Sequence, residues 1–168
     1  PFAIGALPLP LASAYLRSAT AQGLVTFDTK GRITPALANR WIVTDDGMSY
    51  IFRLNKTRWN DGREVTSEEV VGLLQSRFRE LRGSRFNAEL AVVDKVISMT
   101  GKVVEIRLKA PMPYFLEMIA QPEFGLVRKG FGSGPMQAKK FEQAMRLQLK
   151  GIDEKGDPVL ENESVTLR

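Results

Sequence analysis

The sequence contains neither cysteine nor histidine. Without cysteine the chain has no disulfide, no thiolate nucleophile and no cysteine metal site. Without histidine, the Ser-His-Asp and Cys-His catalytic arrangements are impossible, as are the common histidine-containing zinc and iron sites. Carboxylates and a serine–lysine pair remain as catalytic groups, but no placed nucleophile or proton shuttle is visible among them. We therefore predict that the chain is not an enzyme and holds no metal or cofactor.

Long apolar runs are lacking as well. No stretch of about 18 consecutive apolar residues occurs, which excludes a transmembrane helix of ordinary length. Residues 1–16 are apolar, yet they lack the basic leader and continuous hydrophobic stretch of a signal peptide. A mature exported protein would look the same after cleavage of its signal.

Charge of one sign is not concentrated anywhere in the chain. The 24 Lys and Arg residues are interspersed with 19 Asp and Glu residues along the sequence. The net charge is +5. A basic balance can indicate a nucleic-acid partner, but no run of four basic residues occurs. We interpret the pattern as a solvated surface of mixed charge and predict no nucleic-acid binding. At 168 residues the chain can bury a real core, as one domain or as two small lobes.

The clearest helix signal covers residues 67–81. Thr66 is suited to cap the N-terminus, and Glu69, three residues on, completes a capping box. Apolar residues then recur at helical spacing, namely Val70, Val71, Leu74, Phe78 and Leu81. We interpret this stripe as core packing.

Turn residues separate several short stretches of β-strand character. These stretches are residues 23–27, 41–44, 49–54, 92–99, 102–109 and 165–167. Gly47 and Gly101 lie in turns that predict two hairpins. Residues 36–41 indicate a short helical turn, and residues 114–120 a short helix. Strands and helices mix without regular βαβ alternation, so we predict an α/β or mixed α+β domain with a mixed β-sheet and flanking helices.

The loop Gly132-Ser133-Gly134-Pro135 could suggest a phosphate-binding loop. It lacks the Gly-Lys-Ser/Thr ending whose lysine and hydroxyl hold phosphate and magnesium. We therefore interpret it as a flexible turn.

Four stretches resemble, in order and spacing, the bacterial extracellular solute-binding proteins of family 5, which bind peptides and nickel for ABC importers. They lie within residues 23–41, 46–71, 104–124 and 132–135. WNDG at residues 59–62 is similar to the family's "W.DG", LKAPMPYFL to its "L..P.PYFL", and GSGP to its "GTGPY". The resemblance covers residues 23–136. The sequence departs from it at Met136, where the family has an aromatic residue.

The resemblance implies a fold and a function. Residues 1–168 would form the N-terminal lobe of a type II periplasmic binding-protein fold, with the second lobe supplied by sequence outside this chain. The protein would capture peptides or a similar small solute between the lobes and present it to the membrane subunits of an ABC importer. The expected location is periplasmic, or extracytoplasmic as a membrane-anchored lipoprotein. Two alternatives stay open, namely the ligand-sensing domain of a transcriptional regulator and a standalone interaction domain.

The resemblance also implies candidate ligand-binding residues. Leu7 and Pro8 in the N-terminal loop, and Arg85, Phe86 and Glu89 after the main helix, are expected to face the cleft. For Phe86 simple core packing is the alternative. Without a second lobe the cleft face is expected to be unusually apolar, and therefore a candidate surface for self-association.

Overall fold

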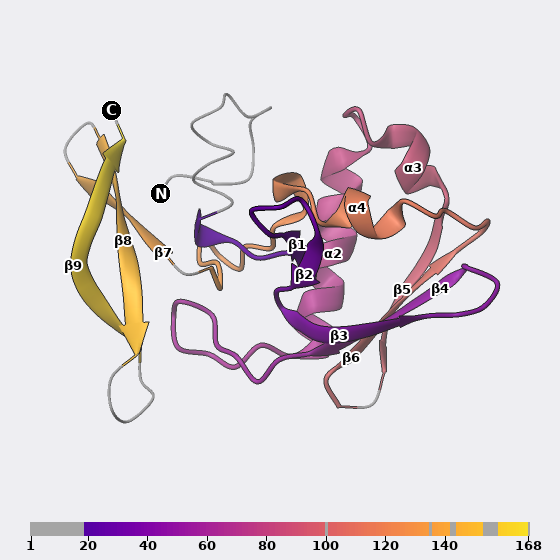
Figure 1. The fold of residues 1–168 in the computed structure, drawn as a ribbon, viewed down its shortest axis with the longest axis horizontal. Coiled ribbons are helices and arrows are strands. Elements are labelled where there is room, and N and C mark those ends of the chain that lie inside the picture. The colour runs from indigo at the N-terminus through magenta and orange to yellow at the C-terminus, as the bar shows by residue number, and fades with distance from the viewer. Residues whose placement is uncertain (1–18, 100, 135, 142–143, 153–157, 168) are drawn as a thin grey trace.

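The computed structural model describes residues 19–99, 101–134, 136–141, 144–152 and 158–167. Its strands form three separate sheets (Figure 1). A two-stranded sheet contains β1 (Val25–Phe27) and β2 (Ile33–Pro35), and a four-stranded sheet has the order β3 (Ala38–Val43), β4 (Ser49–Leu54), β6 (Val103–Leu108), β5 (Val93–Met99). A three-stranded sheet contains β7 (Met136–Phe141), β8 (Ala144–Ile152) and β9 (Pro158–Leu167), and lies at the opposite end of the molecule from the four-stranded sheet (Figure 1).

Helices cover one face of the four-stranded sheet. The long helix α2 (Ser67–Leu81) crosses it, while α3 (Asn87–Ala91) leads into β5. The short helix α4 (Phe115–Ile119) and a 3-10 turn (Pro122–Phe124) follow β6. The chain is thus a mixture of helices and sheets, as predicted. Every strand pair in the described residues is antiparallel, although a mixed sheet was expected. The reason is local, because tight turns join β3 to β4 and β5 to β6 and so reverse the chain between neighbours.

The helix predicted at residues 67–81 is confirmed. Thr66 caps it, since its hydroxyl oxygen accepts a hydrogen bond from the Glu69 backbone N–H at 3.3 Å. The predicted stripe faces the sheet, where Leu74 packs in one core with Phe52 and Ile106. Four of its five members are buried, and Val71 is half-buried against them. Burying each of these side chains stabilises the fold by roughly 1.5–3 kcal/mol.

The helical turn predicted at residues 36–41 is wrong. Residues 38–43 form strand β3, in which Trp41 pairs with Phe52. Before the strand, the backbone N–H groups of Leu37 and Ala38 donate to the carbonyls of Gly23 and Leu24, at 3.1 and 2.9 Å. In the extended form, the backbone N–H and C=O groups find hydrogen-bond partners on both sides of the segment. These hydrogen bonds outweigh the weak helical propensity of the alanines.

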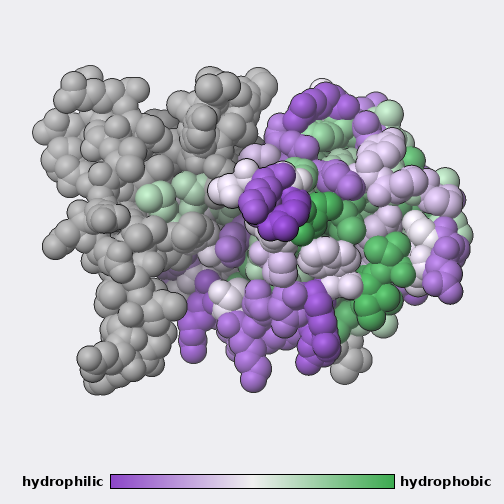
Figure 2. All heavy atoms as spheres, in the orientation of Figure 1, coloured by the Kyte–Doolittle hydropathy of each residue, from purple (hydrophilic) through white to green (hydrophobic). Residues whose placement is uncertain are grey.

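On the face shown in Figure 2, the described residues are mostly hydrophilic, with patches of hydrophobic residues over the part that contains the four-stranded sheet. Within the described residues the large exposed apolar side chains are Ile42, Val43, Met99, Tyr114 and Phe131. Ile42 and Val43 are neighbours on β3, and the other three lie elsewhere in the chain.

Candidate functional site

The glycine-rich loop at residues 132–134 packs directly against another part of the backbone. The Gly134 N–H donates to the Thr20 carbonyl at 2.9 Å, and the Asn60 N–H donates to the Gly132 carbonyl, also at 2.9 Å. A Cβ atom on Gly132 would lie 1.8 Å from the Thr20 carbonyl oxygen, and one on Gly134 would lie 2.5 Å from the Thr20 carbonyl carbon. Only glycine fits at either position. The interpretation as a flexible turn is therefore wrong, because the loop is buried and hydrogen-bonded.

A buried arginine holds the neighbouring segments to this loop. Arg128 donates through Nε to Glu69 Oε1 at 2.9 Å and through Nη1 to Asp61 Oδ2 at 2.5 Å. The other carboxylate oxygen of Glu69 accepts from Trp59 Nε1 at 3.1 Å. The guanidinium is only 11% exposed, and two carboxylates compensate its desolvation. The capping-box role predicted for the Glu69 side chain is thus replaced by contacts with Trp59 and Arg128.

These contacts bring two of the family-like stretches, residues 46–71 and 132–135, together at one place. Glu69, at the start of α2, accepts hydrogen bonds from Trp59 and Arg128, and Arg128 also donates to Asp61. The loop at residues 132–134 hydrogen-bonds to Asn60 and to Thr20. We call this set, Thr20, Trp59, Asp61, Glu69, Arg128, Gly132 and Gly134, the junction. Its polar groups hydrogen-bond to one another, so the junction fixes the relative placement of these segments.

The most deeply buried carboxylate is that of Glu105, on the face of β6 turned away from α2. It is 6% exposed and accepts from Arg107 Nε at 2.8 Å and from Ser49 Oγ at 3.1 Å. The hydrogen bond from Arg107 holds the pKa of Glu105 below its ordinary value. A general acid or base working near neutral pH needs a raised carboxyl pKa, so this group acts as a structural ion.

The structure describes three of the five predicted ligand-binding residues, and Leu7 and Pro8 lie outside the described residues. Arg85 has a side chain 67% exposed that pairs with Glu123 at 2.9 Å and lies 4.6 Å above the Phe86 ring. Phe86 is 8% exposed and packs edge-on against Phe124 at 5.0 Å, the placement expected of a core residue.

Glu89 lies on α3, one helical turn beyond Phe86. It is half-buried, and its Oε2 atom is buried without a hydrogen-bond partner among the described residues. The structure therefore brings Arg85 and Phe86 into contact and leaves Glu89 nearby. That these residues face a solute stays a prediction.

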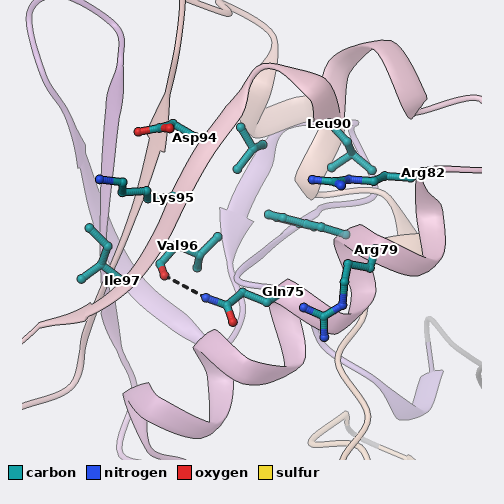
Figure 3. Close-up of a pocket in the computed structure, with 10 residues that line it drawn as sticks. Gln75, Arg79, Arg82, Leu90, Asp94, Lys95, Val96 and Ile97 are labelled. Atoms are coloured by element: carbon teal, nitrogen blue, oxygen red, sulfur yellow. Dashed lines mark hydrogen bonds between the residues drawn. The ribbon is translucent and has the colours of Figure 1, made fainter.

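Sequence reasoning missed a groove between α2 and β5 (Figure 3). It has a volume of about 370 Å³. Its lining residues are Gln75, Phe78, Arg79, Arg82, Leu90 and residues 93–97. The sequence does carry a signal, because Gln75, Arg79 and Arg82 recur at helical spacing beside the apolar stripe.

The part of the chain that the structure describes shows neither a cluster of metal ligands nor a membrane-spanning helix. No three acidic, cysteine or histidine side chains gather there as metal ligands would. None of the helices described is both long enough and apolar enough to span a membrane.

A family model matches residues 32–154, that of the bacterial extracellular solute-binding proteins, family 5, middle region. The match covers most of the sequence. It includes every residue of the junction except Thr20. This chain belongs to that family of extracellular solute-binding proteins.

Individual relatives agree with this assignment. The probable deoxycholate-binding periplasmic protein YgiS of Escherichia coli K12 is 32% identical over 119 residues, which are 60% of this chain and 22% of that protein. The dipeptide-binding protein of the same organism is 24% identical over 157 residues, 72% of this chain and 29% of that protein. The chain therefore spans less than a third of the length of these relatives.

Solved structures show the same fold. NikA from Brucella suis, in complex with Fe(III)-EDTA, superposes with a TM-score of 0.79 at 16% identity over 98% of this chain and 36% of its own. DppA from Helicobacter pylori, in complex with the peptide STSA, gives 0.73 at 16% identity over 85% of this chain and 36% of its own. The fold is therefore that of type II periplasmic binding proteins, as predicted.

Proposed function

We propose that this chain forms the N-terminal lobe of an extracytoplasmic solute-binding protein of an ABC importer. The solute, a peptide or a similar small molecule, is held between this lobe and a second one and is then presented to the importer's membrane subunits. The observation that carries the proposal is the family match over residues 32–154, whose motif-bearing segments converge on the junction. Relatives with transporter and periplasmic names support the same role and location.

The proposed division of labour follows from the geometry of a cleft. Small-molecule sites enclose most of the ligand surface, which usually needs walls on both sides. This lobe supplies one wall, with Leu7, Pro8, Arg85, Phe86 and Glu89 as the candidate contacts. Closure of two lobes about a hinge encloses the solute. The junction stiffens this lobe so that such closure moves it as one body.

The proposal includes no catalysis and makes self-association a secondary property of the isolated chain. Apolar side chains such as Ile42 and Met99, 64% and 43% exposed, would favour self-association at high concentration. Sedimentation that stays monomeric at all concentrations would argue against this part.

The experiment is a thermal-shift screen of the whole gene product with dipeptides, longer peptides, opines, sugars and nickel chelates. A ligand that binds only the folded state stabilises it by mass action and so raises the midpoint temperature of unfolding. At a ligand concentration 100 times the dissociation constant, the added stability is about 2.7 kcal/mol. We expect one chemical class to stabilise the protein. No stabilisation by any class at saturating concentration would contradict the proposal.

A further inference from the structure

The groove between α2 and β5 has the form of a small-molecule site. One wall is a single helical stripe, Gln75, Phe78, Arg79 and Arg82, at spacings i, i+3, i+4 and i+7. The other wall is formed by residues 93–97 of the sheet's edge strand, and Leu90 of α3 closes one end (Figure 3). Its volume of about 370 Å³ falls at the lower end of the range of roughly 300–1,000 Å³ found for ligand sites.

The base of the groove is apolar. Phe78, Leu90 and Val96 belong to the buried core and are 6%, 1% and 9% exposed. In Figure 3 the Val96 side chain points toward α2, whereas the side chains of Lys95 and Ile97 point away from it. The edge of the core is thus open to an apolar group that enters the groove.

The rim carries the cationic residues Arg79, Arg82 and Lys95 and one carboxylate, that of Asp94, which forms no ion pair with the two arginines. Arg79 and Arg82 are exposed, and neither guanidinium has an ion-pair or hydrogen-bond partner within the described residues. The neighbouring arginines differ, because Arg77 pairs with Glu80 and Arg85 pairs with Glu123. The Arg82 side chain extends across the groove toward β5 (Figure 3). The unpaired guanidinium groups of Arg79 and Arg82 therefore lie beside a groove with an apolar base.

An added peptide strand does not suit this edge. The Gln75 side-chain amide donates to the Val96 carbonyl at 3.2 Å, so a main-chain acceptor of the edge is already used (Figure 3). The register of β5 also shifts between Val93 and Lys95, which bulges the strand at Asp94. Bulges and charged residues are common protections of sheet edges against strand addition. These features disfavour an added strand, and the volume of about 370 Å³ fits a small molecule.

We propose that this groove binds a small amphipathic monocarboxylate, with the carboxylate on Arg79 and Arg82 and the apolar body against Phe78, Leu90 and Val96. Guanidinium groups match carboxylates through paired N–H donors, and burial of the apolar body adds the hydrophobic contribution. None of the residues proposed to contact the solute of the cleft lines this groove.

The test is calorimetric titration of the 168-residue chain with sodium decanoate below its micelle concentration. Decyltrimethylammonium is the matched probe of opposite charge, and amide chemical shifts report the location. We expect decanoate to shift residues 75–82 and 93–97, and decyltrimethylammonium to leave them unchanged. Equal binding of the two probes, or shifts confined to other residues, would overturn the proposal.

Variants make the test specific. Arg79→Gln with Arg82→Gln removes both charges and keeps polar side chains at two exposed positions, and should weaken decanoate binding at least tenfold. Arg40→Gln is the control, an exposed arginine on β3 at the opposite edge of the same sheet, and should leave binding unchanged. Circular dichroism verifies that each variant is folded. A folded double variant that binds decanoate as the unsubstituted chain does would refute the site.

Discussion

Replacing Gly132 by alanine tests the junction more severely than any other single substitution. The new Cβ would lie 1.8 Å from the Thr20 carbonyl oxygen and 2.7 Å from its carbon, and both are backbone atoms that cannot rotate away. The segments must separate, which costs about 1–3 kcal/mol for overpacking. It also strains the Gly134–Thr20 and Asn60–Gly132 hydrogen bonds, each worth about 0.5–1.5 kcal/mol. We expect a total loss of about 2–6 kcal/mol in the free energy of unfolding.

The matched control is Gly72→Ala, in the exposed interior of α2 with no heavy atom within 4 Å of the new Cβ. Alanine is the better helix former there, so this variant should be stabilised by up to about 1 kcal/mol. Urea unfolding followed by circular dichroism measures both changes, and fluorescence of the buried Trp59 reports the junction itself. A loss below 0.5 kcal/mol for Gly132→Ala would refute the close approach of the two segments.

Three further outcomes follow from the described contacts. Leu74→Ala empties a fully buried position on α2 and should cost about 2–5 kcal/mol in chemical denaturation, whereas a loss below 0.5 kcal/mol would contradict the helix placement. Thr66→Ala removes the N-cap and should cost about 1 kcal/mol, while Thr66→Ser should restore most of the loss. The pKa of Glu105 is lowered in the folded chain, so its stabilising contribution is present above its unfolded pKa and is lost as pH falls through the folded pKa. Unfolding measured across the acid range should therefore show a shallower loss of stability below about pH 5 for Glu105→Gln, and an unchanged slope would exclude this role.

The elements that local sequence determines were predicted well. Helix α2 starts and ends at the predicted residues because the cap at Thr66 and the apolar stripe both lie within it. The hairpins β3–β4 and β5–β6 form around Gly47 and Gly101, whose positive φ angles of 66° and 76° suit the turns. In each case the deciding interactions join residues close in the sequence.

The features set by distant contacts were not predictable in the same way. The extended form of residues 38–41 depends on backbone partners in β4 and at Leu24. The side chain of Glu69 accepts a hydrogen bond from Arg128, 59 positions away in the sequence. The tight packing of Gly132 depends on Thr20. The groove beside α2 could not be predicted because it depends on where β5 lies relative to the helix. Only the family-like spacing indicated that residues 59–62 and 132–134 belong to one structural unit.

The measurement that tests the account most directly is parallel calorimetric titration of the whole gene product and of these 168 residues alone with the same peptide library. Since one wall of a cleft cannot enclose a ligand, we expect ordinary affinity for the whole product and weak or no peptide binding for the isolated chain. A peptide bound by the isolated chain as tightly as by the whole product would contradict the two-lobe account and place the site within these residues.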